Sequence, residues 1–478
     1  MTRGYEIVSG NAHGLRDVAD FIETLNERET LFEPQKELTI ARAPGRLDVM
    51  GGIADYSGSL VLELPISEAT FVALQEDDAR QLRIVSLLDN EKLSFEMPLS
   101  HLEQDGEPIE YDKAQRYFTR HWAAYVAGVF LVLSRERGVR FDRGARVLIS
   151  SRVPEGKGVS SSAALEVATM SAVASAFGIA VGPRDLALLC QQVENLVVGA
   201  PCGVMDQMTA ACGEANHLLS LICQPAELQG SLRLPEDLGV WGLDSGVRHS
   251  IGAGDYGSVR AGTFMGYRII AELAGFTVRE SGARVVIDDP RWGGYLANLP
   301  PAEYEEKFAA HLPETLLGEE FILHYGGTTD RVTKVERDRR YAIRAPAEHA
   351  IYESFRVKKF AELLDRQDSR SSGGDRMAMG ELMYASHESY SACGLGSHGT
   401  DLLVGLVRSL GVDQGLFGAK ITGGGSGGTV AVLGRSDAES AVLDIAHRYA
   451  AMTGHEPHVF RGSSPGSAAF GRLVVKNS

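Results

Sequence analysis

Apolar residues recur at helical spacing in two neighbouring segments near the middle of the chain. Residues 163–177 consist of good helix formers without a breaker, and residues 184–198 repeat the same pattern. The spaced positions are Leu165, Thr169 and Val173 in the first segment and Leu186, Leu189, Val193 and Leu196 in the second. Steps of three and four residues predict two helices that each bury one face.

Short apolar runs elsewhere predict strands. They are Leu38 to Ala43, Leu60 to Leu64, Thr70 to Leu74 and Ala145 to Ile149, and Ala419 to Leu433 predicts a strand, a glycine loop and a second strand. The first run meets Pro44 and Gly45, which predict a break in the strand.

The rest of the chain is less regular. Residues up to about Glu37 predict a helical lead-in with polar loops, and helical patterns return from Phe355 onward. Between about Gly262 and Ser354, prolines interrupt a polar region, and we expect irregular elements there that decorate a core. At 478 residues the chain exceeds the usual length of one domain, which predicts two packed domains or one large two-lobed domain.

Charge and cysteine content narrow the class of protein. The formal net charge of −16 is spread along the sequence, so the phosphate backbone of a nucleic acid would be repelled. The five cysteines are odd in number and include no C-x-x-C pair, which fits a reducing cytoplasm. No signal-peptide pattern follows Met1, and the apolar run from Trp122 to Leu133 predicts a buried helix because it is too short to span a bilayer. We expect a cytoplasmic protein without a nucleic-acid or membrane partner.

A glycine- and serine-rich segment precedes the first predicted helix. It reads Gly156-Lys157-Gly158-Val159-Ser160-Ser161-Ser162. Glycines let the backbone approach an anion, and consecutive amides at a helix N-terminus point at it, so the segment is a candidate phosphate cradle. It is not a Walker A loop, because Gly158 stands where serine or threonine would follow Gly156-Lys157. Taken alone, a glycine turn with a serine N-cap explains it better.

Acidic residues in apolar surroundings follow this segment. Asp206 comes just after the tight turn Pro201-Cys202-Gly203, and a carboxylate held there could act as general base for a sugar hydroxyl. Glu194 lies beside the buried face of the second predicted helix. The Ser162 hydroxyl could complete a Mg²⁺ shell together with a carboxylate. Taken alone, a helix-start aspartate and a solvated helix glutamate are the more common explanations.

Two further segments could complete a site. Gly423 to Gly428 holds five glycines in six positions between apolar strands, which predicts close backbone approach to a ligand or another loop. A simple hairpin turn would not need so many. Near the first strand, Arg46 could stabilise charge on a transferring phosphoryl group and Asp55 could hold sugar hydroxyls, although an ordinary surface pair also fits.

Taken together and in this order, the segments resemble the three motifs of the GHMP kinases, the superfamily of galactokinase, homoserine kinase, mevalonate kinase and phosphomevalonate kinase. Ala43-Pro44-Gly45-Arg46 and Asp55-Tyr56 are similar to the galactokinase signature, and Pro201-Cys202-Gly203 with Met205-Asp206-Gln207 matches that subfamily. The resemblance implies an α/β (α+β) two-lobed fold. Its N-terminal lobe would resemble ribosomal protein S5 domain 2, and its C-terminal lobe would be ferredoxin-like.

The resemblance also implies a domain plan. After a lead-in over residues 1–37, we expect the N-terminal lobe over 38–229 and the C-terminal lobe over 230–478. The region around 262–354 would be an insertion in the C-terminal lobe.

The same resemblance assigns roles to single residues. It implies that Asp206 is the catalytic base and Arg46 its charge-stabilising partner. The residues implied to bind the nucleotide are Gly156, Gly158, Ser160, Ser161, Ser162, Gly424 and Gly425. Those implied to bind the sugar are Asp55, Gly52, Gly203, Asp206 and Tyr256, the last of which follows Arg248-His249-Ser250. Ser162 and Glu194 match the Mg²⁺ ligands, so ATP and Mg²⁺ are the implied cofactors.

One position departs from the galactokinase pattern. Galactokinases carry a glutamate–histidine pair where this chain has Gly52-Ile53, and the acid of that pair reaches the exocyclic hydroxymethyl group of the sugar. L-Arabinopyranose has the ring configuration of D-galactopyranose without that group, so this sugar would permit the loss of the pair. We expect a glutamate restored at Gly52 to shift activity toward D-galactose.

Three segments closely resemble the kinase domain of the L-arabinokinases. They are residues 43–58, 295–301 and 393–397. The hypothesis is therefore ATP-dependent phosphorylation of the anomeric hydroxyl of L-arabinose, which gives the sugar 1-phosphate and ADP. A galactokinase or broad-specificity sugar 1-kinase is the nearer alternative, and a non-catalytic sensor of sugar and ATP is the alternative from another class. The oligomeric state stays open.

Overall fold

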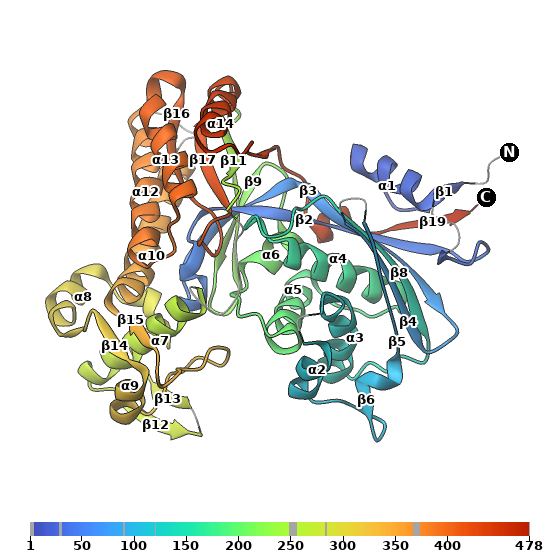
Figure 1. Ribbon diagram of the computed structural model, residues 1–478, viewed down its shortest axis with the longest axis horizontal. Helices are drawn as coiled ribbons and strands as arrows, with labels where there is room; N and C mark the ends of the chain where they lie inside the picture. The colour runs from blue at the N-terminus through green and yellow to red at the C-terminus, as the bar shows by residue number, and fades with distance from the viewer. Residues whose placement is uncertain are drawn as a thin grey trace.

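Two β-sheets organise the protein (Figure 1). The computed structural model describes residues 4–27, 31–88, 91–119, 121–247, 256–282, 284–366 and 373–477. Within these ranges the larger sheet has nine strands and the second sheet has four. Arg248-His249-Ser250, which precedes Tyr256 in the stretch that resembles the galactokinases, lies outside the described residues.

The nine-stranded sheet brings the two ends of the chain together. Its main order is β1-β19-β2-β3-β8-β4-β5, with β9 on β3 and β10 on β9. The bounds are β1 Tyr5–Ser9, β2 Leu38–Met50, β3 Leu60–Asp77, β4 Gln81–Leu88, β5 Glu91–Pro98, β8 Gly144–Ser151, β9 His217–Ile222, β10 Glu227–Arg233 and β19 Leu473–Asn477. The β4–β8 pair is parallel and the other pairs are antiparallel. β1 and β19 are neighbours, so the N- and C-terminal labels lie side by side in Figure 1.

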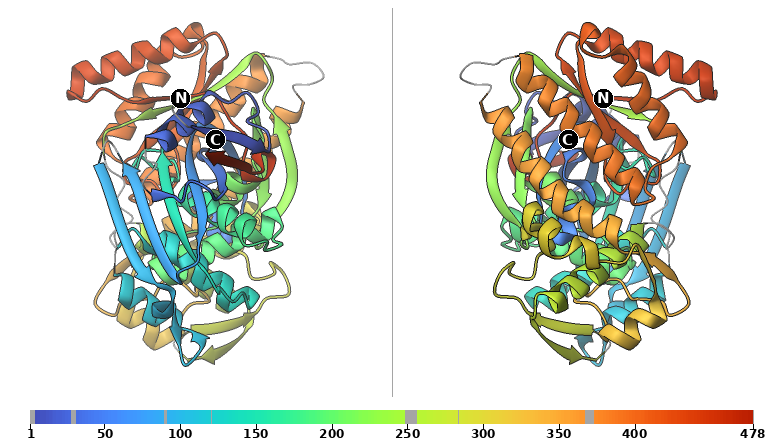
Figure 2. Two further views of the ribbon diagram at one scale, coloured as in Figure 1. Left: turned by 90° about the vertical axis from the view of Figure 1, so that its right-hand side faces the viewer. Right: turned by 90° about the vertical axis from the view of Figure 1, so that its left-hand side faces the viewer.

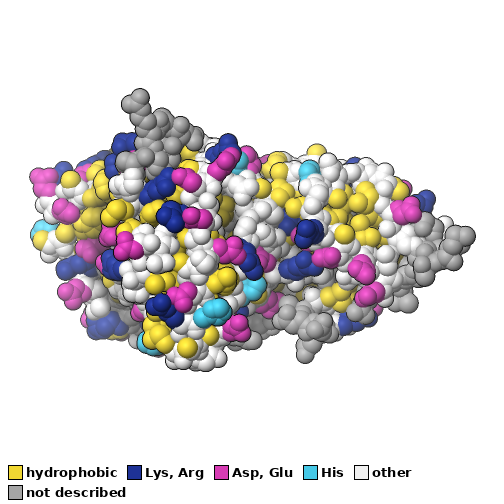
Figure 3. All heavy atoms as spheres, turned by 90° about the horizontal axis from the view of Figure 1, so that it is seen from above, with side chains coloured by type: hydrophobic (Ala, Val, Ile, Leu, Met, Phe, Trp, Pro, Cys, Tyr) yellow, Lys and Arg dark blue, Asp and Glu magenta, His cyan; other side chains and the backbone are white. Residues whose placement is uncertain are grey.

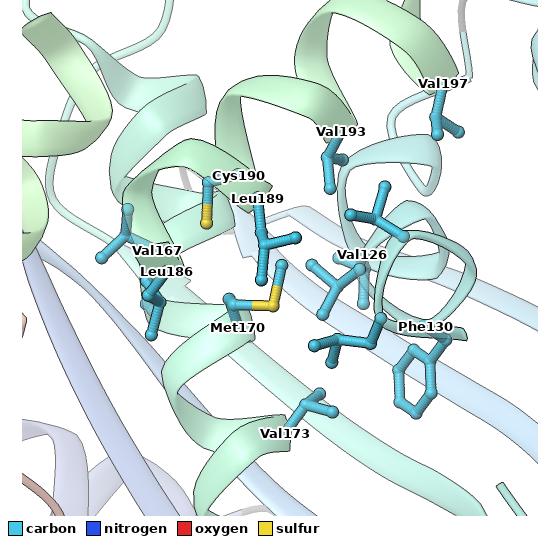
Figure 4. Close-up of a cluster of buried hydrophobic side chains, with 14 of the residues drawn as sticks. Val126, Phe130, Val167, Met170, Val173, Leu186, Leu189, Cys190, Val193 and Val197 are labelled. Atoms are coloured by element: carbon cyan, nitrogen blue, oxygen red, sulfur yellow. The ribbon is translucent and has the colours of Figure 1, made fainter. Parts of the chain in front are cut away.

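Helices cover both faces of this sheet. On one face lie α2 Tyr111–Phe118, α3 Ala124–Arg137, α4 Ser161–Ala176, α5 Pro183–Gln192, the π-helical turn η4 Val193–Val198 and α6 Met205–Cys212. Side chains of α3, α4, α5 and η4 converge in the core shown in Figure 4. Val147 points into this core, whereas the next residue, Leu148, packs with Phe21 of α1 (Arg16–Asn26). This alternation is the period of two that a strand covered on both faces requires.

The second sheet has the order β16-β17-β11-β18. Its strands are β11 Leu238–Asp244, β16 Leu416–Ile421, β17 Thr429–Arg435 and β18 Val459–Arg461, and the helices around it are α10 Arg344–Asp365, α12 Gly373–Ala392, α13 His398–Leu410 and α14 Glu439–Thr453. The right-hand view of Figure 2 shows these helices packed over the sheet. Leu403 of α13 and Val442 of α14 are fully buried against Val430 and Val432 of β17.

A third group of elements connects α7 (Tyr256–Leu273) to α10. We call it the β12–β15 segment, residues 277–342. It contains β12 Thr277–Ser281, β13 Arg284–Asp288, η5 Leu296–Asn298, α8 Pro301–Lys307, η6 Ala309–His311, β14 Thr315–Leu317, α9 Gly318–Tyr325 and β15 Arg340–Ala342. Trp292, Tyr304 and Phe321 bury their rings here against Ile270 of α7 and Ile351 of α10. The segment thus has a small core of its own (lower left in Figure 1).

Several expected elements differ from those observed. The two helices predicted from periodicity are confirmed as α4 and α5, although the second one ends in the π-helical turn η4. The strands predicted at 60–64 and 70–74 are one strand, β3, because its first part pairs with β9 and its second part with β8. β2 likewise continues through Pro44 and Gly45, where only its register shifts. The break predicted there is wrong, because a bulge absorbs the missing proline N–H.

The region 262–354 is also more regular than expected. α7 extends to Leu273 and α10 begins at Arg344, so long helices border the segment between them. The proposed lobe boundary at 229/230 falls within β10, and β19 returns to the first sheet. The assignment of the two lobes to these residue ranges therefore stays a prediction.

Two surface properties bear on partners. Among the described residues, none of the helices combines the length and the apolar character that a membrane crossing requires. On the face shown in Figure 3, Lys and Arg side chains stand among Asp and Glu side chains and do not gather into one patch.

Candidate active site

An ion pair between β2 and α6 lies at the centre of the site. Arg46 donates from Nε to Oδ1 of Asp206 at 3.0 Å, and its Nη2 lies 2.8 Å from the same oxygen. Its Nη1 donates to the carbonyl oxygen of Gly158 at 2.7 Å. Arg46 is 2% exposed, whereas the Asp206 side chain is 21% exposed. The structure thus joins the two residues predicted to be catalytic and keeps the Asp206 carboxylate accessible.

Buried charges behind Arg46 hold it in place. Oε2 of Glu63 lies 3.2 Å from Nε of Arg46, and burial, together with the nearby charge of Asp48, raises the pKa of Glu63. Asp48 forms a fully buried ion pair with Lys420 at 2.6 Å. The sequence analysis missed all three of these residues. A charged residue inside an apolar strand, as in Leu62-Glu63-Leu64 and Ala419-Lys420-Ile421, is the signal that could have found two of them.

The glycine–serine loop ends at the N-terminus of α4. Gly156, Gly158 and Ser160 have φ values of 69°, 72° and 62°, and α4 begins at Ser161. The Ser160 hydroxyl is buried and has no hydrogen-bond partner among the described residues. Free amides at a helix N-terminus and an unpaired hydroxyl suit a phosphate group.

The glycine loop packs directly on this first loop. A Cβ atom at Gly428 would lie 2.8 Å from the carbonyl oxygen of Lys157, and one at Gly423 would lie 2.9 Å from that of Gly158. The predicted close backbone approach is therefore present. Gly425 faces Leu395 instead, where a Cβ would lie 2.8 Å from the Leu395 Cβ, and Gly424 is half-buried.

The two predicted Mg²⁺ ligands lie together beside the loop. A hydrogen bond from Ser162 reaches Glu194, which is 3% exposed. Burial raises the pKa of Glu194 to about 7, the Ser162 hydrogen bond lowers it and the charge of Asp206 raises it. Nε2 of Gln207 donates to Glu194 at 2.6 Å and to buried Glu166 at 3.2 Å. A hydroxyl and a carboxylate are hard oxygen donors, so this pair fits a Mg²⁺ ion that also binds phosphate oxygens.

The predicted sugar ligands form a second cluster next to Asp206. Asp55 lies in the 3₁₀ turn η2 (Gly52–Ser57), and a Cβ atom at Gly203 would lie 1.6 Å from its Oδ2. The Gly203 backbone therefore touches the Asp55 carboxylate. The ring of Tyr256 stands edge-on to that of Tyr56, with centroids 5.9 Å apart. Asp55, Gly203, Tyr256 and Asp206 are thus brought together.

The buried Asp55 carboxyl predicts a pH effect on stability. Burial raises its pKa to about 7, the charge of Asp206 adds to the rise, and Arg260 opposes it. Between the ordinary pKa of about 4 and this value, the folded state keeps a proton that the unfolded chain has lost. Unfolding free energy should therefore fall as pH rises from 4 to 7. We expect Asp55→Asn to flatten this fall in urea titrations without ligand between pH 5 and 7.5, and an unchanged slope would contradict the raised pKa.

Gly52 lies in a different environment from the one expected. A Cβ atom there would lie 1.4 Å from the Tyr390 hydroxyl oxygen, and the Gly52 φ is 34°. That hydroxyl accepts from the Ile53 amide and donates to the Gly423 carbonyl, both at 2.9 Å. A side chain at Gly52 would have to displace Tyr390. The shift of selectivity expected from a single glutamate there stays a prediction.

Gly52→Ala is expected to lower the free energy of unfolding by about 1–3 kcal/mol, because the new methyl group overlaps Tyr390. Gly405→Ala is the matched control: Gly405 lies in α13 with no atom within 4 Å of a new Cβ. This variant should gain about 0.5–1 kcal/mol, since alanine favours a helix. Urea denaturation measures both, and equal effects would refute the packing at Gly52.

Comparison with known proteins agrees with this geometry. The model of the GHMP kinases N terminal domain matches residues 124–214, and the galactokinase galactose-binding signature matches residues 29–76. The galactokinase of Chloroflexus aggregans is 31% identical over 87% of this chain and 89% of its own length. The chain belongs to the galactokinase family of GHMP kinases. The predicted family is thereby confirmed.

Two further relatives of this GHMP kinase are informative. The L-arabinokinase of Arabidopsis thaliana is 46% identical over 99% of the chain, and the chain spans 52% of that longer protein. The structure of Lactococcus lactis galactokinase complexed with galactose superimposes with a TM-score of 0.71 at 20% identity, covering 94% of this chain and 99% of that one. The predicted two-lobed GHMP kinase fold is confirmed.

Proposed function

We propose that this chain is an ATP-dependent sugar 1-kinase that phosphorylates the anomeric hydroxyl of L-arabinose. The observation that carries the proposal is the Arg46–Asp206 pair, which is hydrogen-bonded to the carbonyl of Gly158 in the phosphate loop. An accessible acid and a buried cation thus adjoin the place where a terminal phosphate would lie. The 46% identity to an L-arabinokinase supports the choice of sugar.

Asp206 acts as the base in this proposal. Its partly exposed carboxylate accepts the proton of the anomeric hydroxyl, which is more acidic than an ordinary alcohol. Arg46 holds that carboxylate in position and offsets the negative charge that grows on the transferring phosphoryl group. Asp55 orients the sugar by accepting hydrogen bonds from its ring hydroxyls, and Gly203 and Tyr256 lie beside Asp55.

The two glycine-bearing loops hold the nucleotide. The α4 N-terminal amides and the hydroxyls of Ser160, Ser161 and Ser162 bind the phosphates, and Gly424 and Gly425 close the loop over them. Ser162 and Glu194 would hold Mg²⁺, which when bound neutralises phosphate charge. The packing of Gly428 on Lys157 keeps the two loops at a fixed separation.

D-Galactose is the alternative substrate, and the match to the galactokinase galactose-binding signature favours it. Gly52 has no side chain and the side chain of Ile53 is apolar, so neither can hydrogen-bond an exocyclic hydroxymethyl group. This difference supports the smaller sugar. The proposed location is the cytoplasm, with small-molecule substrates as the only partners proposed.

ADP release with MgATP and, separately, L-arabinose, D-galactose and D-galacturonate tests the proposal. Asp206→Ala protein serves as the blank. Preference for L-arabinose is expected. Preference for D-galactose would keep the kinase but overturn the sugar assignment, and no turnover with any sugar would favour a sensor that binds without catalysis.

A further inference from the structure

A buried ion pair links the β12–β15 segment to helix α7. Nε and Nη2 of Arg260 each donate to one oxygen of Asp330, both at 2.8 Å. Asp330 lies between α9 and β15. Its side chain is 2% exposed and that of Arg260 is 7% exposed. Asp330 also accepts from the amide and the hydroxyl of Thr333. Its position is therefore held from both sides.

Two further contacts of Arg260 lead to the proposed sugar site. Nη1 donates to the carbonyl oxygen of Cys202 at 3.0 Å, in the turn before Asp206. The guanidinium also stacks over the ring of Tyr56 at 5.3 Å, and Tyr56 follows Asp55 directly. One side chain thus contacts both segments that carry the predicted sugar ligands.

We propose that Arg260 and Asp330 are positioning residues of the sugar site. The β12–β15 segment contributes to that site through Asp330. Arg260 connects the turn at Cys202 to η2. Asp330 orients the guanidinium group of Arg260 and balances its charge. This proposal rests on the proposed sugar kinase activity.

Charge balance makes Asp330 necessary in this arrangement. Arg260 is 6% exposed, so removing the Asp330 charge leaves a buried cation without its bidentate partner. Asp55 is close enough for its charge and that of Arg260 to interact. The guanidinium would then turn toward Asp55 and release the Cys202 carbonyl. This movement would displace the Asp55 carboxylate, which is proposed to hold the sugar.

Asp330→Asn, a near-isosteric change, is the first test. Thermal stability should fall, because a buried cation loses its charged partner. The KM for L-arabinose is expected to rise about tenfold to 100-fold, while the KM for ATP changes little. Steady-state kinetics with each substrate varied in turn separates the two. Equal rises in the KM for L-arabinose and the KM for ATP would show that the ion pair only supports the fold, and would overturn the proposal.

Arg260→Lys keeps the charge opposite Asp330 but loses the fork that also reaches Cys202. Arg268→Lys is its matched control, because Arg268 lies on the same helix, is also 6% exposed and also contacts the β12–β15 segment, through the carbonyl of Tyr325. Only Arg260→Lys should raise the KM for the sugar. Equal effects of the two variants would overturn the proposal even if Asp330→Asn failed to fold.

Wild-type protein in the same assays separates this inference from the proposed function. A wild type that turns over no sugar refutes the kinase proposal itself. An active wild type with an unchanged sugar KM in Asp330→Asn and Arg260→Lys refutes only the positioning role.

Discussion

Asp206→Asn is expected to lower kcat for sugar phosphorylation by about 10²–10⁴-fold, the usual contribution of a positioned general base. The amide keeps the size of the carboxyl group and can still accept from Arg46, but it cannot take the proton of the hydroxyl. Affinity for ATP should be retained, because the loop from Gly156 to Ser162 is unchanged. ADP release measures the first quantity, and calorimetric titration with the nucleotide measures the second.

Asp185→Asn is the matched control for this variant. Asp185 also lies in the first turn of a helix, α5, and also pairs with an arginine, Arg137, at 2.7 Å, but its side chain is 47% exposed on the surface. Removing the charge of Asp185 should leave kcat for sugar phosphorylation unchanged. Turnover of Asp206→Asn near the wild-type level would remove Asp206 from the proposed mechanism.

Lys420→Met should lower the free energy of unfolding by about 3–5 kcal/mol, the usual cost of leaving one partner of a buried ion pair uncompensated. Both Lys420 and Asp48 are 0% exposed. Asp48 also accepts from the amides of Gly52 and Gly423, so its displacement would disturb η2 and the glycine loop together. Urea denaturation, followed by tryptophan fluorescence, measures the loss.

Lys359→Met makes the same change in an exposed pair. Lys359 lies 3.3 Å from Glu362 on α10, and the two side chains are 42% and 57% exposed. Solvent screens such pairs, so a change of less than about 1 kcal/mol is expected. If Lys420→Met were as stable as Lys359→Met, the buried pair would not hold the two loops.

The geometry of the proposed phosphate-binding part of the site could largely be predicted from sequence. The segment Gly156 to Ser162 depends on local backbone freedom and on the start of α4, and both are properties of neighbouring residues. The five glycines of the second loop likewise predicted the close approach now seen between Gly428 and Lys157. Helices α4 and α5 were visible because their apolar residues recur at helical spacing: α4 packs on β2 and β3, and α5 packs on α4 and α6.

Strand boundaries were predicted less well. Pro44 and Gly45 are local breakers, and they indicated an end to the strand at Ala43. β2 nevertheless continues to Met50, because its second part pairs with β3 and Gly45 lies where a Cβ would come within 2.6 Å of the Val159 carbonyl oxygen. Pairing with distant strands therefore outweighed the local preference.

The sequence by itself determined the family, the fold and the segments proposed to bear the chemistry, because these depend on residue types at short, fixed spacings. Only the tertiary structure decided which side chains support them. Lys420 meets Asp48 across 372 residues, Tyr390 fills the space beside Gly52, and Asp330 reaches Arg260 from the β12–β15 segment. Such contacts depend on how whole elements pack. The number of residues between two positions in the sequence does not say how close they lie in the folded protein.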